Sequence, residues 1–293
     1  AAQTPAEIPN NLPIQLTSFV GREQENRQIA ELFDEAQVRL VTITGPGGIG
    51  KTRLSVQTGN TLLSRFPDGV WFLALDTIMD ARYVITEIAA ELGVPPDPAK
   101  DPKRQMIEYL ADKQLLLILD NFEHLMDAAP IVGELLRGSR TLCCLVTSQE
   151  ALQIAGERLL ALTPLSMPPQ GTRDVEALTR YDSVRLFMER VHTVKPDFEL
   201  TRENADTVAA ICHRLDGLPL ALELAAARMR GMAVVGWFNW IFTPVLSETP
   251  YLSGVYRIDD LAVSINNGLG LTMAPLRFHA PAEVTMIRLK REI

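Results

Sequence analysis

Residues 41–53 read VTITGPGGIGKTR, a run of β-branched residues that passes into a glycine-rich loop. Residues 45–52 fit the pattern G-x-x-x-x-G-K-[ST] at all eight positions. They also lie between a predicted strand, residues 38–44, and a predicted helix that begins at Gly50, which is the context of a phosphate-binding loop. The alternative is a glycine turn before a helix, and the full match in this context disfavours it. The stretch therefore predicts a bound nucleotide.

The residue types of this loop have a physical explanation. Gly47, Gly48 and Gly50 lack a Cβ, so the backbone can turn there and approach phosphate oxygens closely. The amides of the loop and the helix N-terminus then form a cradle for an anion. We expect Lys51 to reach the β and γ phosphates and the Thr52 hydroxyl to ligate magnesium.

Composition limits the class of protein. The 293 residues exceed the ~100 to 200 of one domain, so two or three packed units are expected. The chain has 47% hydrophobic and 22% charged residues, which is an ordinary globular balance. Its formal net charge of −8 disfavours direct nucleic-acid binding by this region, because phosphate neutralisation needs clustered lysine and arginine.

The cysteines and the apolar stretches are used to predict the cellular compartment of the protein. Cys143, Cys144 and Cys212 have no metal-like spacing to histidine and are expected to be buried thiols in a reducing cytosol. No basic region followed by an apolar run is found at the start of the chain. The uncharged stretch 231–247 is shorter than the ~20 residues that span a bilayer. The expectation is a cytoplasmic protein without a membrane segment.

Strands alternate with helices over the first half of the chain. Residues 1–20 contain three prolines and are predicted to be an extended lead-in. A helix is predicted from Arg22, on a stripe formed by Ile29, Leu32, Phe33 and Ala36. The predicted strands are residues 38–44, 70–75, 115–120, 141–148 and 158–162. The second, VWFLAL, is expected to be buried on both faces. This alternation predicts a parallel sheet with helices on both faces.

The pattern changes after the fifth predicted strand. Helical stripes without strands follow, formed by Val184, Phe187, Met188, Val191, Ala205, Val208, Ala209 and Cys212. They continue into GLPLALELAAARMR, where Pro219 suits a first helical turn. We therefore predict an α/β nucleotide-binding domain at 21–165, a small all-helical lid domain at 166–231 and an unassigned segment at 232–293, with mixed strands and turns.

An acid ends the third predicted strand. Asp120 closes LLLILD, where a carboxylate that holds magnesium directly or through water is expected. The next residue is Asn121, and an amide cannot accept the proton of an attacking water. Glu123 is the nearest alternative carboxylate, either as that base or as a solvated charge. This pattern favours slow turnover.

Polar residues also end the fourth predicted strand, beside the phosphate site. Residues 147–150 read TSQE, and Ser148 and Gln149 are candidates for sensing a γ phosphate. A polar strand end without such a role is the equal alternative.

Five motifs in this order resemble the STAND NTPases, and among them the NB-ARC-like bacterial regulators. The motifs are NLPIQLTSFVGRE, GPGGIGKTRL, LLLILDNFEHL, TLCCLVTSQEAL and GLPLALELAAAR, and the resemblance covers roughly residues 11–230. It implies that Val20, Gly21 and Arg22 lie against the adenine and ribose, and that Pro219 packs on the base or sugar from the lid. Two departures are visible. Position 149 is Gln where the family usually has Arg, and the segment after Arg230 does not align, so His279 has no assigned role.

The loop, the strand ends and the resemblance together give a set of candidate site residues. Those assigned to the nucleotide are Val20, Gly21, Arg22, Gly45, Gly47, Gly48, Ile49, Gly50, Lys51, Thr52, Ser148, Gln149 and Pro219. Those assigned to magnesium are Thr52 and Asp120, and those assigned to catalysis are Lys51, Asp120 and Glu123.

The leading hypothesis is a switch that binds ATP or ADP with Mg²⁺ and hydrolyses ATP slowly. Effector and sensor modules would lie outside this chain, and a nucleotide-dependent oligomer is possible. One alternative is an AAA+-like remodelling ATPase that takes an arginine such as Arg140 or Arg158 from a neighbouring subunit. Others are a pseudo-NTPase that binds nucleotide only for stability and a phosphotransferase, for which the sequence offers no acceptor base.

Overall fold

A computed structural model describes residues 8–229, 254–258 and 261–265. The chain divides into two compact units, residues 1–235 and 236–293. The first unit holds the predicted nucleotide-binding and lid domains.

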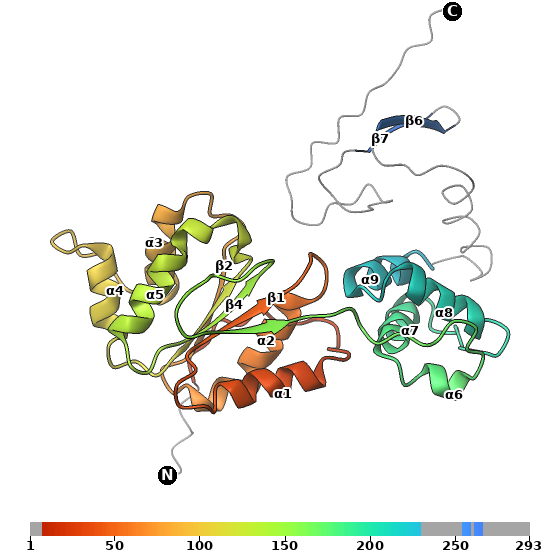
Figure 1. Cartoon of the computed structure of the whole chain (residues 1–293), viewed down its shortest axis with the longest axis horizontal. Helices are drawn as coiled ribbons and strands as arrows, with labels where there is room; N and C mark the ends of the chain where they lie inside the picture. Colours follow the sequence, from red (N-terminus) through yellow and green to blue (C-terminus); the bar gives the residue numbers. More distant parts are fainter. Residues whose placement is uncertain (1–7, 230–253, 259–260, 266–293) are drawn as a thin grey trace, which may run out of the picture. The chain divides into compact units, whose positions relative to one another are not determined.

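A five-stranded sheet forms the centre of the nucleotide-binding domain, with strand order β2-β3-β4-β1-β5 (Figure 1). Its strands are β1 (Leu40–Thr44), β2 (Val70–Ala74), β3 (Leu116–Asp120), β4 (Cys143–Ser148) and β5 (Glu157–Ala161). Every neighbouring pair is parallel. The predicted parallel sheet is therefore confirmed, and each strand lies within two residues of its expected start.

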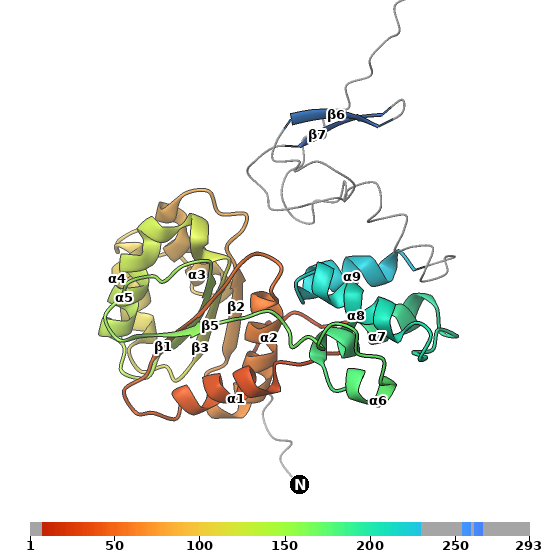
Figure 2. The same cartoon turned by 45° about the vertical axis from the view of Figure 1, so that its right-hand side comes forward.

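Helices cover both faces of the sheet (Figure 2). One face packs against α1 (Glu23–Leu32) and α2 (Lys51–Leu62), and the other against α3 (Val84–Glu91), α4 (Pro102–Leu110) and α5 (Ala129–Gly138). Strand β3 shows why, because Leu116 and Ile118 face the first core and Leu117 and Leu119 face the second. The helix after Arg22 ends at Leu32, shorter than its predicted stripe.

Short 3₁₀ turns join these elements. They are η1 (Leu63–Arg65), η2 (Ala81–Tyr83), η3 (Phe122–His124) and η4 (Met126–Ala128). Helix α2 approaches β3 closely because it carries Gly59, where a Cβ would stand 2.8 Å from the Ile118 side chain. This close packing fixes the helix that begins at the phosphate loop.

Strand β2 is an edge strand, and helices cover both of its faces, as expected. Val70 is buried in one core and Leu73 in the other, while the side chain of Phe72 is half-buried. The lead-in covers this edge: the Asn11 amide donates to the Phe72 carbonyl at 2.8 Å and accepts from the Phe72 amide at 2.6 Å. The Val70 amide donates to Pro9 in the same way. A covered edge cannot pair with another chain.

The lid domain is helical, as predicted. It contains α6 (Val175–Leu178), α7 (Asp182–Val194), α8 (Ala205–Arg214) and α9 (Pro219–Ala227), and α7 packs against both α8 and α9. The predicted stripe residues are buried, apart from Met188, which is half-buried. Pro219 occupies the first turn of α9, where its missing N–H costs nothing.

In the second unit the structure describes one antiparallel pair, β6 (Gly254–Ile258) and β7 (Leu261–Ile265). The stretch 231–247 and His279 lie outside the described residues. Among the helices of the described part of the chain, none is long and apolar enough to cross a membrane.

Candidate functional site

The glycine-rich loop joins β1 to α2. Its backbone is left-handed at Gly45 (φ 152°), Gly48 (φ 75°) and Gly50 (φ 95°), conformations that favour glycine. Gly47 differs from the expectation, because its φ lies outside this region and a Cβ there would meet nothing within 4 Å. Only an approaching ligand would require glycine at position 47. Ile49 buries its side chain in the core.

Lys51 is held inside this loop. Its Nζ donates to the Gly45 carbonyl at 2.8 Å and to the Pro46 carbonyl at 3.2 Å, and the residue is 6% exposed. Burial lowers the pKa of Lys51, while the carboxylates of Glu123 and then Asp120 raise it. The ammonium group therefore lies within the loop that is predicted to cradle phosphate, with two acids nearby.

Asp120 lies at the end of β3 and is 3% exposed. Its Oδ2 accepts from the Thr52 hydroxyl at 2.9 Å, and its Oδ1 accepts from the Thr147 hydroxyl at 2.6 Å. Burial raises the pKa of Asp120, and the hydrogen bonds from Thr147 and Thr52 lower it. A buried carboxylate beside a hydroxyl is the hard oxygen chemistry that suits Mg²⁺. The two predicted magnesium ligands are thus in direct contact.

Thr147 is a residue that sequence reasoning missed. It is fully buried at the end of β4, and its hydroxyl accepts from the Asn121 amide at 2.9 Å while it donates to Asp120. Asn121 has a left-handed backbone, φ 60°, which asparagine tolerates better than most residues. Thr147 therefore fixes both Asp120 and the turn that follows it.

The two sensor candidates differ in their surroundings. Ser148 is fully buried, and its hydroxyl accepts from the Glu150 amide of its own loop at 3.3 Å. Gln149 instead donates from Nε2 to Oε1 of Glu123 at 3.1 Å. The structure therefore brings Gln149, but not the Ser148 hydroxyl, against another predicted site residue.

Most of the residues assigned to the base line a small pocket. Val20, Arg22 and Pro219 are among its lining residues, whereas Gly21 is not, and its volume is about 30 Å³, which is room for one water. An adenine ring would need this pocket to widen.

Arg22 is tied to protein atoms and is 7% exposed. Its guanidinium donates to the Thr163 carbonyl at 2.5 Å and pairs with Glu25 at 2.6 Å. Gly21 lies against the lid, because a Cβ there would be 3.1 Å from the Asp182 side chain. Arg22 thus braces the linker to the lid, and its contact with the base stays a prediction.

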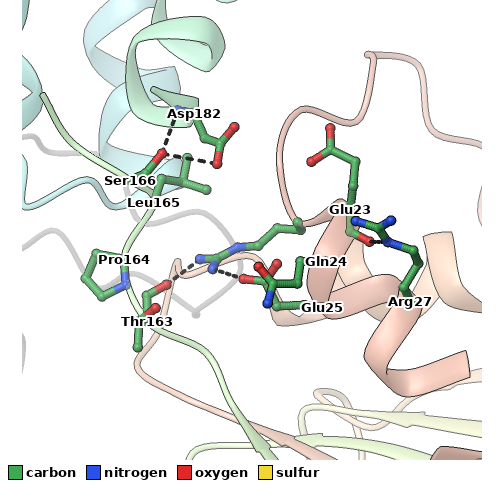
Figure 3. Close-up of a pocket in the computed structure, with 10 residues that line it drawn as sticks. Glu23, Gln24, Glu25, Arg27, Thr163, Pro164, Leu165, Ser166 and Asp182 are labelled. Carbon is green, nitrogen blue, oxygen red and sulfur yellow. Dashed lines mark hydrogen bonds and ion pairs between the residues drawn. The ribbon is translucent and has the colours of Figure 1, made fainter. Parts of the chain in front are cut away.

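A larger polar cavity of about 420 Å³ lies beside this linker (Figure 3). Its lining includes Arg22, Glu23, Ser166 and Asp182 but no residue of the phosphate loop. Ser166 and Asp182 are hydrogen-bonded to each other there. The cavity is therefore separate from the phosphate chemistry.

The lid motif touches the phosphate loop directly. The Leu220 amide donates to the Gly48 carbonyl at 3.2 Å. A Cβ at Gly48 would stand 3.0 Å from the Leu220 Cβ, and one at Gly50 would stand 3.8 Å from Pro219. The contact of Pro219 with the base or sugar stays a prediction, and its neighbour makes the closer contact with the loop.

An ionic cluster forms a second bridge between the two domains. Glu223 of α9 accepts from Arg53 of α2 at 2.8 Å and from Arg190 of α7 at 2.9 Å. Both arginines also donate to the Ser18 carbonyl of the lead-in, at 2.9 Å each. Burial lowers the pKa of Arg53, and Glu223 raises it. Arg53, a residue without a role predicted from the sequence, therefore joins the phosphate-loop helix, the lead-in and the lid.

Sequence comparisons identify several relatives. Residues 34–156 match the family model described as AAA domain. An uncharacterized protein of Mycobacterium tuberculosis is 40% identical over 214 residues, which are 73% of this chain and 51% of that protein. A putative HTH-type transcriptional regulator of the same species is 38% identical over 68% of this chain and 21% of its own length. Regulatory protein AfsR of Streptomyces griseus is 26% identical over 94% of this chain and 27% of its own length. The chain spans about half or less of these relatives.

Solved structures support the fold. A Walker-type ATPase of Pyrococcus abyssi matches with a TM-score of 0.50 and 11% identity, over 78% of this chain and 74% of that one. A STAND protein with a tetratricopeptide repeat sensor from Pyrococcus horikoshii matches with a TM-score of 0.49 and 17% identity, over 82% of this chain and 34% of its own. The second likeness is too distant to carry an argument.

Proposed function

We propose that this chain, a STAND-like P-loop NTPase with an AAA-type domain, is an ATP- and ADP-binding switch module. In this proposal it hydrolyses ATP slowly, and hydrolysis and nucleotide exchange control a signalling or transcriptional output outside the chain.

The contact between lid and phosphate loop is the observation that carries this proposal. The Leu220 amide binds the carbonyl of Gly48, a residue of the loop that would hold the phosphates. The phosphates of a nucleotide and the lid would therefore contact the same segment of backbone. ATP and ADP would contact this loop differently, so each would bind the open-lid and closed-lid states with different affinity. Such a difference in affinity is what shifts a conformational equilibrium.

The residues around Asp120 support slow hydrolysis with magnesium. Thr52 and Asp120 would hold the ion, which neutralises phosphate charge when bound. Lys51 would supply a fixed positive charge from within the loop. Asn121 follows Asp120 and cannot accept a proton, so the base must come from elsewhere.

The regulatory output rests on the relatives. Two of them are named as regulators, and this chain spans 21% and 27% of their lengths. We propose that the effector and sensor modules correspond to parts of longer proteins outside this region. A cytoplasmic location fits a regulator and is part of the same proposal.

The switch is tested by what the purified chain retains and how fast it turns over. Nucleotide released by denaturation would be identified by mass spectrometry, and ATP hydrolysis would be followed over many turnovers. Retained ADP with turnover far below the enzyme median of ~10 per second supports the switch. Turnover near that median contradicts it, and retained nucleotide without any hydrolysis favours the pseudo-NTPase.

The remodelling alternative stays a prediction. The two arginines suggested for it lie near the N-terminal ends of their strands: Arg158 in the first half of β5, 3.8 Å from Glu35, and Arg140 before β4. Hexamers that form only with nucleotide would favour this alternative.

A further inference from the structure

Glu123 has two carboxylate oxygens in different surroundings. Oε1 accepts from the Gln149 amide at 3.1 Å. Oε2 is buried and has no hydrogen-bond partner among the residues that the structure describes. A buried oxygen without a partner is costly, so a group that arrives with the substrate is the natural donor to it.

Charge places this carboxylate within the phosphate site. Of the two acids that raise the Lys51 pKa, Glu123 has the larger effect and Asp120 the smaller. Glu123 also raises the pKa of Asp120. Because its Oε2 atom is also buried, the interpretation of Glu123 as a simple solvated charge is disfavoured.

The other polar groups near Glu123 already have hydrogen-bond partners or cannot act as a base. Both oxygens of Asp120 accept from hydroxyl groups, of Thr52 and Thr147. Asn121 carries an amide, which is not a base. Among the groups described around Lys51, the Oε2 atom of Glu123 is thus the carboxylate oxygen that remains available to a water.

We propose that Gln149 is a positioning residue, which holds Oε1 of Glu123 and so aims Oε2 at the water that attacks ATP. The inference rests on the proposed hydrolysis. In the step, the water oxygen bonds to the γ phosphorus, the bond from that phosphorus to the β–γ bridging oxygen breaks, and Oε2 takes the proton of the water. The products are ADP and inorganic phosphate, and the proton then leaves Glu123 for solvent.

The neutral amide at position 149 fits this role. An amide donates one hydrogen bond to the carboxylate and leaves its charge uncompensated. A guanidinium would hold the same carboxylate in a charge-assisted, often bidentate pair and so compete for both oxygens. Glutamine at position 149, where the family usually has arginine, thus orients the carboxylate of Glu123.

A double-mutant cycle tests the proposal with the whole chain. The variants are Gln149→Ala, Glu123→Gln and the double variant, with Glu150→Ala as the matched control because Glu150 is exposed next to Gln149. Single-turnover hydrolysis at saturating Mg-ATP gives the rate constant, and a fluorescent ATP analogue gives the affinity. Thermal unfolding reports whether each variant is folded.

We expect Glu123→Gln to lower the rate constant about 100-fold or more, as loss of a general base does. Gln149→Ala lowers it about 10-fold or more, and the double variant is no slower than Glu123→Gln alone. ATP affinity changes less than about 3-fold, since general-base catalysis acts on the chemical step. The Glu150→Ala control keeps the wild-type rate.

Three results would overturn the proposal. In the first, Gln149→Ala hydrolyses ATP like wild type. In the second, the double variant is slower than Glu123→Gln alone. Either result shows that Gln149 does not act through Glu123. Loss of ATP affinity alone in Gln149→Ala has the same meaning, because it indicates a direct phosphate contact. A wild-type chain without any hydrolysis refutes the proposed slow ATPase itself, which separates the two failures.

Discussion

The phosphate site differs from the contact between the lid and the nucleotide-binding domain. This contact, called the lid seam below, consists of the Leu220–Gly48 hydrogen bond and the ion pairs of Glu223. In the phosphate site, Lys51, Asp120 and Thr147 are buried and bond to neighbouring strand ends and to the loop. At the seam, the side chains of Arg53 and Glu223 are 30% and 28% exposed. Partly exposed ion pairs contribute about 0–1 kcal/mol each, whereas a buried polar group left without its partner costs about 1–3 kcal/mol.

This contrast has a functional meaning. The phosphate site is rigid, because breaking any of its bonds leaves a buried donor or acceptor unpaired. In the seam, water can replace the partly exposed Arg53–Glu223 pair at small cost, whereas the side chain of Arg190 is only 10% exposed, so its pair with Glu223 is the part that resists opening of the lid. A switch needs both properties: a fixed grip on the nucleotide and a closure that a modest difference in affinity can reverse.

The strongest disruption of the rigid side is Asp120→Asn. We expect Mg-dependent ATP affinity to fall about 10- to 100-fold, because a charge-assisted contact of about 1.5–3 kcal/mol is lost. The measurement is a titration with a fluorescent ATP analogue, with and without Mg²⁺. Equal affinity of wild type and variant in Mg²⁺ would show that Asp120 does not serve the ion.

The same variant has a pH signature. Burial raises the pKa of Asp120 in the folded chain above its ordinary 3.8, so folding binds a proton more tightly there. The stabilisation from this group is complete below that value and is lost as pH rises through the folded pKa. The unfolding free energy of wild type relative to Asp120→Asn should therefore fall as pH rises from about 3.8. A difference that stays constant with pH would contradict the raised pKa.

A pair of glycine substitutions separates the loop itself from the seam. Gly48→Ala forces an L residue into a left-handed conformation and places a Cβ 3.0 Å from Leu220, so we expect a loss of about 1–2 kcal/mol in unfolding free energy. Gly47→Ala meets no atom within 4 Å and should change stability by less than about 0.5 kcal/mol. Urea denaturation without nucleotide measures both, and equal effects would refute the difference between the two positions.

The seam responds to removal of its ion pair. Arg53→Ala removes one cation of Glu223 and a donor to the lead-in, and we expect ADP to dissociate about 2- to 5-fold faster, the equivalent of about 1 kcal/mol or less. Raising the salt concentration should speed release from wild type more than from the variant, because ion pairs are screened. An identical salt dependence of ADP release from wild type and variant would show that the ionic cluster does not slow ADP release.

The smallest change is expected for Gln149→Arg. If Gln149 acts on Glu123, the ratio of ATP to ADP affinity stays within about 2-fold of wild type, while hydrolysis slows because the guanidinium holds the carboxylate. Equilibrium titrations with both nucleotides measure the ratio. A variant that binds ATP much more tightly relative to ADP would show that position 149 senses the γ phosphate.

The sequence predicted the parts whose physics is local. A phosphate loop needs glycine, Lys51 and Thr52 at fixed spacing, and an apolar strand that ends in Asp120 marks the magnesium side, so spacing alone located both. The edge position of β2 was not predicted, because strand order is set by crossovers that leave no mark within a strand. The apolar residues of VWFLAL correctly indicated burial on both faces but carried no information on the position of the strand in the sheet.

The contacts that the sequence did not reveal join distant residues. Arg53 and Glu223 are 170 positions apart, and a single arginine or glutamate on a helix carries no signal of its partner. Thr147 gave no signal either, since threonine is common in strands and only the geometry shows it bonded to Asp120. The resemblance assigned Pro219 to the base or sugar and did not indicate the hydrogen bond to the loop, which requires an N–H that proline lacks and Leu220 has.

The central claim is that the lid seated on the phosphate loop retains the nucleotide. Its most direct test is the dissociation rate of a fluorescent ADP analogue from wild type, Glu223→Ala and the control Glu176→Ala, which removes an exposed lid carboxylate away from the seam. We predict release at least 5-fold faster from Glu223→Ala and an unchanged rate for the control. Equal release rates from all three proteins would contradict the account.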